Sequence, residues 1–178
     1  MRTLLLVIIA AVAVFGAVVA LQPADFTVAR SLTMAAPPQV VFAQVDDLRK
    51  WDAWNPWQKK DPTMKIVFNG PSSGAGASYS WSGNRDVGEG RLTITQSRPN
   101  ELVQLKLEFT RPFEATNTAA FRFVPVGNQT AVTWSMAGHN NYFAKAFNLV
   151  MNMDKTIGRE FEKGLADMKA VVEAAPKQ

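Results

Sequence analysis

A run of antiparallel strands is indicated by residues 87–137, which read VGEGRLTITQSRPNELVQLKLEFTRPFEATNTAAFRFVPVGNQTAVTWSMA. Apolar and polar residues alternate in short stretches of this segment. Turn-forming residues separate the stretches at Arg98-Pro99-Asn100 and Val126-Gly127-Asn128. Short strands with tight turns are typical of an antiparallel meander. The pattern predicts strands over residues 87–97, 102–109, 116–124 and 130–137.

The sequence on either side of this meander completes one α+β domain. Before it we expect strands over 26–34, 64–69 and 77–81. Between the first two of these we expect a helix from Pro38 to about Asp46 and a short helical turn ending near Pro56. After it, apolar residues recur every three or four positions from Tyr142 to Ala174, which predicts one long helix ended by Pro176. A curved antiparallel sheet wrapped around this C-terminal helix buries both apolar faces.

The N-terminus carries a separate apolar segment. Residues 4–21 are almost entirely Leu, Val, Ile, Ala and Phe, which is enough to cross a hydrocarbon core of about 30 Å. Residues 1–22 are therefore interpreted as a transmembrane anchor, with a signal peptide cleaved near Val18–Ala20 as the alternative. Residues 23–25 form a linker and residues 26–175 the domain. Arg2 favours a cytoplasmic N-terminus, which puts the domain on the extracytoplasmic (periplasmic) side of a single-pass membrane protein, or outside the cell after cleavage.

Composition excludes several kinds of site. The chain has no cysteine and one histidine, His139. We therefore expect no disulfide, no metal site, no cofactor and no cysteine- or histidine-dependent catalytic triad. The net charge of +4 is spread along the chain, which does not indicate nucleic-acid binding.

Three groups of residues resemble a known superfamily. They lie at 30–57, at 74–90, and at 133–136 with 158–165. The first group contains AAPPQVVF and DLRKWDAWNPW, the second GAGASYSWSGN followed by VGEG, and the third TWSM and GREFEKGL. In this order they are similar to the polyketide cyclase/dehydrase branch of the START-like (SRPBCC) superfamily. That resemblance implies a helix-grip fold with a cavity between sheet and helix. It implies little about activity, because one fold supports many functions.

The side-chain parity of the predicted strands and helix suggests a wall for such a cavity, although many of the same residues could simply be core. Glycine inside a helix costs about 1 kcal/mol, so Gly158 and Gly164 suggest close approach of the helix to the sheet or to a ligand. The predicted cavity residues are Tyr79, Trp81, Leu92, Ile94, Leu105, Leu107, Phe109, Asn117, Phe121, Phe123, Trp134, Met136, Phe147, Met151, Asp154, Ile157, Gly158, Phe161 and Leu165.

Asp154 and a cluster of tryptophans each have two possible interpretations. Asp154 tends toward the apolar helix face, where it could contact a ligand or act as a base, or could rotate to solvent. A cation at Arg30 could face it. The tryptophans Trp51, Trp54 and Trp57 could line the cavity mouth and touch a membrane, or could pack beneath the short helices.

Three functions follow as hypotheses. The first is a membrane-anchored module that binds a lipid or other apolar small molecule in an internal cavity. The second is a cyclase- or dehydrase-type enzyme that uses Asp154 or Tyr79 as an acid or base. The third is a protein-interaction domain resembling the heat-shock co-chaperone branch, which requires a filled cavity.

Overall fold

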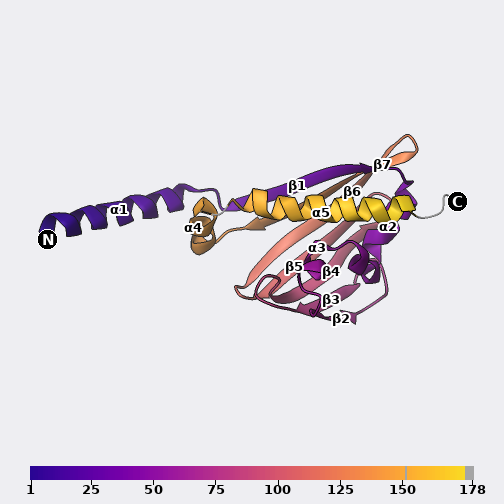
Figure 1. Ribbon diagram of the computed structural model, residues 1–178, viewed down its shortest axis with the longest axis horizontal. Coiled ribbons are helices and arrows are strands. Elements are labelled where there is room, and N and C mark those ends of the chain that lie inside the picture. Colours follow the sequence, from indigo (N-terminus) through magenta and orange to yellow (C-terminus); the bar gives the residue numbers. More distant parts are fainter. Residues whose placement is uncertain (151, 175–178) are drawn as a thin grey trace.

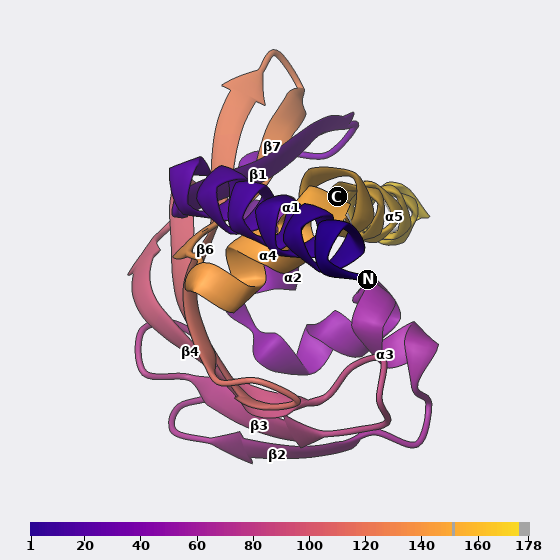
Figure 2. The same cartoon turned by 90° about the vertical axis from the view of Figure 1, so that its left-hand side faces the viewer.

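The computed structural model describes residues 1–150 and 152–174. Its domain is a curved seven-stranded antiparallel sheet that wraps around a long C-terminal helix (Figures 1 and 2). This is the α+β helix-grip fold that the sequence predicts. The strands are β1 (Asp25–Met34), β2 (Lys65–Asn69), β3 (Ser78–Ser82), β4 (Glu89–Arg98), β5 (Leu102–Arg111), β6 (Ala115–Val126) and β7 (Gln129–His139).

The strand order is β1-β7-β6-β5-β4-β3-β2, so six strands form a meander and β1 returns to pair with the last one. In this register Leu32 of β1 lies opposite Val132 of β7, and Phe121 of β6 lies opposite Trp134 of β7. Alternate residues in the central parts of β6 and β7 are buried, as the period of two requires. The inner face of the sheet therefore forms one wall of a single core.

Short helices close one end of the curved sheet. These are α2 (Pro38–Asp46), the 3₁₀ helix η1 (Leu48–Ala53) and α3 (Pro56–Lys60). Proline stands in the first turn of α2 and of α3, where its missing N–H has no partner to lose. The side chains of Val41 and Val45 from α2 and Trp54 after η1 are fully buried in the core.

The predicted long helix is two helices, α4 (Tyr142–Val150) and α5 (Met153–Ala174). The expectation of one continuous helix was wrong, because Asn152 starts a new one. Its Oδ1 accepts a hydrogen bond from the backbone N–H of Lys155 at 2.9 Å, which is the N-cap arrangement. Asn141 caps α4 in the same way through the N–H of Ala144. Pro176, expected to end the helix, lies outside the described residues.

The N-terminal helix α1 (Arg2–Leu21) stands apart from the domain (Figure 1). It is long and apolar enough to cross a membrane, a test that signal sequences also pass. Its side chains are mostly exposed, with Val19 as the buried exception. The helix axis continues the long axis of the domain, and α4 lies at the junction.

Candidate functional site: an apolar cavity under the C-terminal helix

A cavity of about 180 Å³ lies between the sheet and the first turns of α5. Its wall comes from β3, β4, β5, β6 and β7, from the segment carrying η1 and α3, and from α5, so residues far apart in the chain surround one space. The lining residues are Trp51, Asn55, Trp57, Met64, Tyr79, Trp81, Asp86, Val87, Leu92, Leu107, Phe109, Ala119, Trp134, Met136, Ile157 and Phe161.

Stacked aromatic rings hold one side of this wall in place. The ring of Trp134 lies 4.3 Å from that of Phe161 at an interplanar angle of 11°, and 4.7 Å from that of Phe121. The ring of Trp57 meets both Trp134 and Phe161 edge to face. Aromatic pairs of this kind add about 0.5–1.5 kcal/mol beyond area burial. The wall beside α5 is therefore a fixed surface.

Two of the indole N–H groups at the wall, those of Trp51 and Trp81, are satisfied within the protein. Nε1 of Trp51 donates to the carbonyl of Val45 at 2.9 Å, and Nε1 of Trp81 donates to the carbonyl of Val87 at 3.1 Å. A buried N–H with its own partner offers nothing to a ligand. These rings contribute apolar surface to the cavity.

One polar spot remains inside the cavity, formed by Tyr79 and Asn55. Both are buried, with exposed fractions of 5% and 3%. Burial raises the pKa of the Tyr79 phenol, while a hydrogen bond with the Asn55 side chain acts in the opposite direction. The phenol therefore stays protonated at neutral pH and can donate a hydrogen bond.

Asn55 is held by its place at the start of α3. Its Oδ1 accepts from the backbone N–H of Trp57 at 3.0 Å, which caps the helix. Because this hydrogen bond holds the Asn55 side chain to the start of α3, the orientation of its amide N–H groups is fixed. The sequence signal for this residue is the Asn-Pro pair, which is typical of a helix start. The sequence pattern instead predicted a short helical turn ending near Pro56 and did not single out Asn55.

Much of the predicted cavity wall surrounds the cavity, and part of it is core instead. Those that line the space are Tyr79, Trp81, Leu92, Leu107, Phe109, Trp134, Met136, Ile157 and Phe161. Those buried elsewhere in the core are Ile94, Leu105, Phe121, Phe123 and Leu165. Side-chain parity identifies which residues of a strand face inward. It does not show where along the strand the packed side chains leave an empty space.

Among the described residues, the other predicted wall residues lie away from the cavity. Asn117 is half-buried and lies over Gly138 of β7, where a Cβ would overlap its amide oxygen. Phe147 is 55% exposed on α4. Met151 lies outside the described residues. Sequence reasoning also missed Met64, Asp86, Val87 and Ala119, of which the first three lie in or beside loops where parity gives no direction.

Of the two interpretations of the tryptophan cluster, the burial of its side chains favours packing inside the domain. Trp51 and Trp54 are 3% and 0% exposed, and Trp57 is half-buried. Their rings contact one another and the aromatic wall, with Trp51 and Trp54 centroids 4.8 Å apart. The alternative of packing beneath the short helices describes Trp54, while Trp51 and Trp57 face the cavity from inside.

Asp154 lies outside the cavity, against the expectation of a ligand contact. Its side chain is 61% exposed and its Oδ2 is 3.0 Å from Nη2 of Arg30, whose Nε also donates to Glu162 at 2.8 Å. The hydrogen bond from Arg30 lowers the pKa of Asp154. This carboxylate is therefore a weak base, bound to β1 on the outer side of α5.

Gly158 and Gly164 of α5 allow two different close approaches. A Cβ on Gly158 would overlap the Arg30 guanidinium, and one on Gly164 would stand 2.7 Å from Cζ3 of Trp134. Neither glycine lines the cavity. The interpretation that they permit close packing of the helix on the sheet agrees with these contacts.

No metal-binding cluster is present among the residues that the structure describes, in the sense of three or more His, Cys, Asp or Glu side chains. The lone histidine, His139, is exposed at the end of β7, with Nδ1 2.8 Å from Oδ1 of Asp25. It lies apart from the cavity wall.

Comparison with known proteins identifies a family that matches nearly the whole domain. A family model described as "Polyketide cyclase / dehydrase and lipid transport" matches residues 25–173. No curated protein sequence gives a significant match.

Solved structures with the same fold have unrelated sequences. The di-domain ARO/CYC StfQ from the steffimycin biosynthetic pathway superposes with a TM-score of 0.64 at 11% identity, covering 84% of this chain and 51% of that one. Ara h 8.0201 gives 0.59 at 10% identity, covering 85% and 99%. Aha1 from Colwellia psychrerythraea, solved as a dimer, gives 0.58 at 14% identity, covering 85% and 99%. Identities this low show the fold alone.

Proposed function

Since this chain belongs to the polyketide cyclase / dehydrase and lipid transport family, we propose that it is a membrane-anchored module that binds a neutral apolar small molecule. The observation that carries the proposal is the cavity, whose wall is mostly carbon and includes one buried hydroxyl and one buried amide. Concave apolar sites with a few convergent polar groups are the usual form of small-molecule sites.

The size of the cavity limits what fits without movement. An apolar cavity of roughly 150 Å³ in another protein holds benzene, so about 180 Å³ holds a molecule of similar bulk. Longer ligands require the wall to adapt. Met64 and Met136 line the cavity, and the unbranched thioether side chain of methionine adapts readily to different shapes.

The charges at the wall favour a neutral ligand over an acid. Among the described lining residues none is Lys, Arg or His, and the one charged group is Asp86. A carboxylate buried here would have no cation partner, which costs several kcal/mol. A hydroxyl or carbonyl on the ligand, in contrast, can pair with Tyr79 and Asn55.

The cavity supports the binding hypothesis over the interaction-domain hypothesis. An interaction domain of the co-chaperone type would have a filled core. The enzyme hypothesis had proposed Asp154 or Tyr79 as acid or base, and Asp154 lies outside the cavity in an ion pair with Arg30. A Tyr79 phenol with a raised pKa serves as a hydrogen-bond donor to a bound ligand.

Anchoring through α1 completes the proposal. A 20-residue helix spans about 30 Å, the thickness of the hydrocarbon core. Arg2 precedes the helix and the next basic residue is Arg30, which supports a cytoplasmic N-terminus and an extracytoplasmic domain. Protease added to spheroplasts, in which a periplasmic domain is accessible, is expected to cleave the domain, and protection of the domain would indicate the reverse orientation.

A matched pair of ligands tests the binding site. In the full-length chain in detergent micelles, octanol is expected to change the fluorescence of the cavity tryptophans, with empty micelles as the blank. Octanoate, of equal chain length, is expected to bind at least about tenfold more weakly, since about 1.4 kcal/mol corresponds to tenfold. Tyr79→Phe should weaken octanol binding about tenfold through loss of one buried hydrogen bond. Equal binding of acid and alcohol would contradict the neutral-ligand assignment.

A further inference from the structure

Apolar side chains project from the outer side of α4. Tyr142, Phe143, Phe147 and Leu149 are 49%, 83%, 55% and 40% exposed. We refer to these four residues as the α4 apolar face. Large apolar groups that gather on one exposed helix mark a contact surface.

Two hydrogen bonds fix α4 against the end of α1. The Tyr142 hydroxyl donates to the backbone carbonyl of Gly16 at 3.0 Å, and Nζ of Lys145 donates to the carbonyl of Ala20 at 2.9 Å. Gly16 allows this approach, because a Cβ there would lie 3.3 Å from the Tyr142 hydroxyl. The Lys145 ammonium also meets the negative end of the α1 dipole, among its last unpaired carbonyls.

These contacts set the depth of α4 relative to the apolar helix. Gly16 precedes Leu21, the last residue of α1, by five positions, which is about 7 Å along the helix axis at 1.5 Å per residue. Helices that lie in a membrane interface bury their apolar face roughly 5–10 Å into the boundary of headgroups and acyl chains. The Tyr142 ring therefore reaches the depth of such an interfacial helix.

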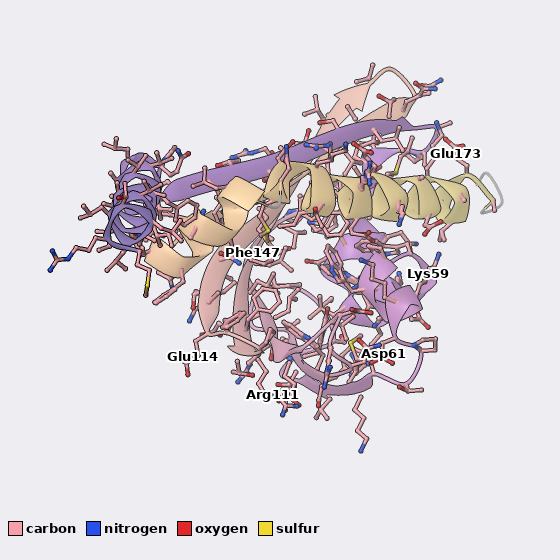
Figure 3. The ribbon with its side chains drawn as sticks, turned by 60° about the vertical axis from the view of Figure 1, so that its left-hand side comes forward. Lys59, Asp61, Arg111, Glu114, Phe147 and Glu173 are labelled. Atoms are coloured by element: carbon pink, nitrogen blue, oxygen red, sulfur yellow. The ribbon has the colours of Figure 1, made fainter. Side chains whose placement is uncertain are left out.

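The direction of α4 agrees with that depth. In Figures 1 and 2, α4 runs across the axis of α1, so it would lie in the plane of a membrane that α1 crosses. Figure 3 shows Phe147 of α4 and Glu114 of the β5–β6 turn toward the α1 end of the domain, with Lys59 and Glu173 toward the other end. The neighbour of Glu114, Phe113, is 81% exposed.

We infer that α4 is an interfacial helix that docks on the lipid bilayer through Tyr142, Phe143, Phe147 and Leu149. This inference rests on the proposed function, since it takes α1 as a membrane anchor. The bilayer is the occupant because α4 is hydrogen-bonded to the very helix that the bilayer surrounds. The contact holds the domain with its α4 end on the membrane surface.

The position of the cavity allows this docking to serve the exchange of ligand with the bilayer. Ile157 in the first turn of α5, Phe109 near the end of β5 and Asp86 in the β3–β4 loop all line the cavity. Ile157 follows α4 closely in the chain. Phe109 and Asp86 lie in or beside the loops at the end of the sheet that carries Phe113. An apolar ligand can then move between bilayer and cavity without exposing its surface to water, which costs about 25 cal/mol per Å².

Single cysteine variants test the inference directly, because the native chain has no cysteine. Phe143→Cys and Phe147→Cys, each labelled with a nitroxide, are placed in the full-length chain in phosphatidylethanolamine and phosphatidylglycerol vesicles. Accessibility to oxygen and to a water-soluble nickel chelate gives the depth of each label. Val12→Cys in α1 and Val126→Cys in the β6–β7 turn are the controls, for the membrane interior and for water.

The expected result is that labels at 143 and 147 collide more with oxygen than with the chelate, while the label at 126 does the reverse. A deep label at 12 with labels at 143 and 147 as water-accessible as that at 126 would overturn the inference and leave the anchor intact. A water-accessible label at 12 would instead overturn the anchor. Spin–spin broadening at 143 between copies would make this face a dimer contact and also overturn the inference.

A second variant separates docking from ligand binding. The double variant Phe143→Ser/Phe147→Ser changes exposed side chains that lie outside the cavity. Octanol binding in micelles should remain unchanged, while uptake of a fluorescent apolar probe from the vesicles should slow several-fold. Uptake at the wild-type rate would show that α4 has no role in ligand exchange with the bilayer. Loss of octanol binding would show that the substitution damages the domain.

Discussion

Filling the cavity from its β-sheet wall should both stabilise the empty protein and abolish ligand binding. Ala119 of β6 is 6% exposed, borders the cavity, and lies between Leu105 of β5 and Met136 of β7 in the sheet register. Ala119→Leu adds three carbons, which at about 0.8 kcal/mol each would contribute at most about 2.4 kcal/mol. Imperfect fit offsets part of this, so we expect a net gain of about 1 kcal/mol.

The assay is chemical unfolding of the full-length chain in micelles, followed by tryptophan fluorescence, together with octanol titration of the folded protein. Ala120→Leu is the matched control, because it makes the same change on the same strand with the side chain on the other face of the sheet. It should leave octanol binding unchanged. An Ala119→Leu variant that binds octanol as wild type does, or that loses stability, would refute the idea of a usable space at this wall.

The two glycines of α5 should respond differently to alanine, although each change gains about 1 kcal/mol of helix propensity. Gly164→Ala places a Cβ 2.7 Å from the stacked ring of Trp134, and overpacking of about 1–3 kcal/mol should outweigh that gain. Gly158→Ala meets only the flexible end of Arg30 and should stay within about 1 kcal/mol of wild type in the same unfolding assay. The reverse order would contradict the assigned contacts. A third prediction concerns acid: because Arg30 lowers the pKa of Asp154 in the folded protein, the contribution of this ion pair is complete above the ordinary value of 3.8 and is lost as pH falls through the lower folded value. The unfolding midpoint of Asp154→Asn should therefore fall less than that of wild type on acidification, and parallel declines would show that the pair contributes nothing.

Strand positions could be predicted from the sequence because each depends on a local signal. Alternation and turn residues place β4 to β7 within about two residues of their observed ends, since a strand with one buried face repeats every two residues. The pairing of β1 with β7 was not predicted, because no local pattern shows which distant strands lie side by side.

The break between α4 and α5 was missed because both sides keep the apolar period of a helix. The signal lay in Asn152, whose side chain caps α5. An asparagine within a helical pattern was interpreted as part of the helix. A Ser, Thr, Asp or Asn in a long periodic segment can equally indicate a new start.

The site was predicted only in part because its geometry depends on tertiary packing. Parity correctly turned Tyr79 and Trp134 inward, yet it could not distinguish cavity wall from filled core along the same strand. A cation at Arg30 was predicted as a possible partner of Asp154, but the helix period could not show that the pair lies outside the cavity. Phe147, which is exposed on α4, was assigned to the cavity because a period shows that a helix has an apolar face but not what covers it.

The account's central claim is that the cavity holds a neutral apolar molecule, and mass spectrometry of the intact protein tests it most directly. The full-length chain is released from micelles in the gas phase, with solvent extraction of a parallel sample, and Ala119→Leu is treated identically. We expect wild type to carry a discrete neutral adduct that the extract identifies and that the variant lacks. A bare mass for wild type, unchanged after incubation with a mixed lipid extract, would contradict the claim and favour a protein-interaction domain.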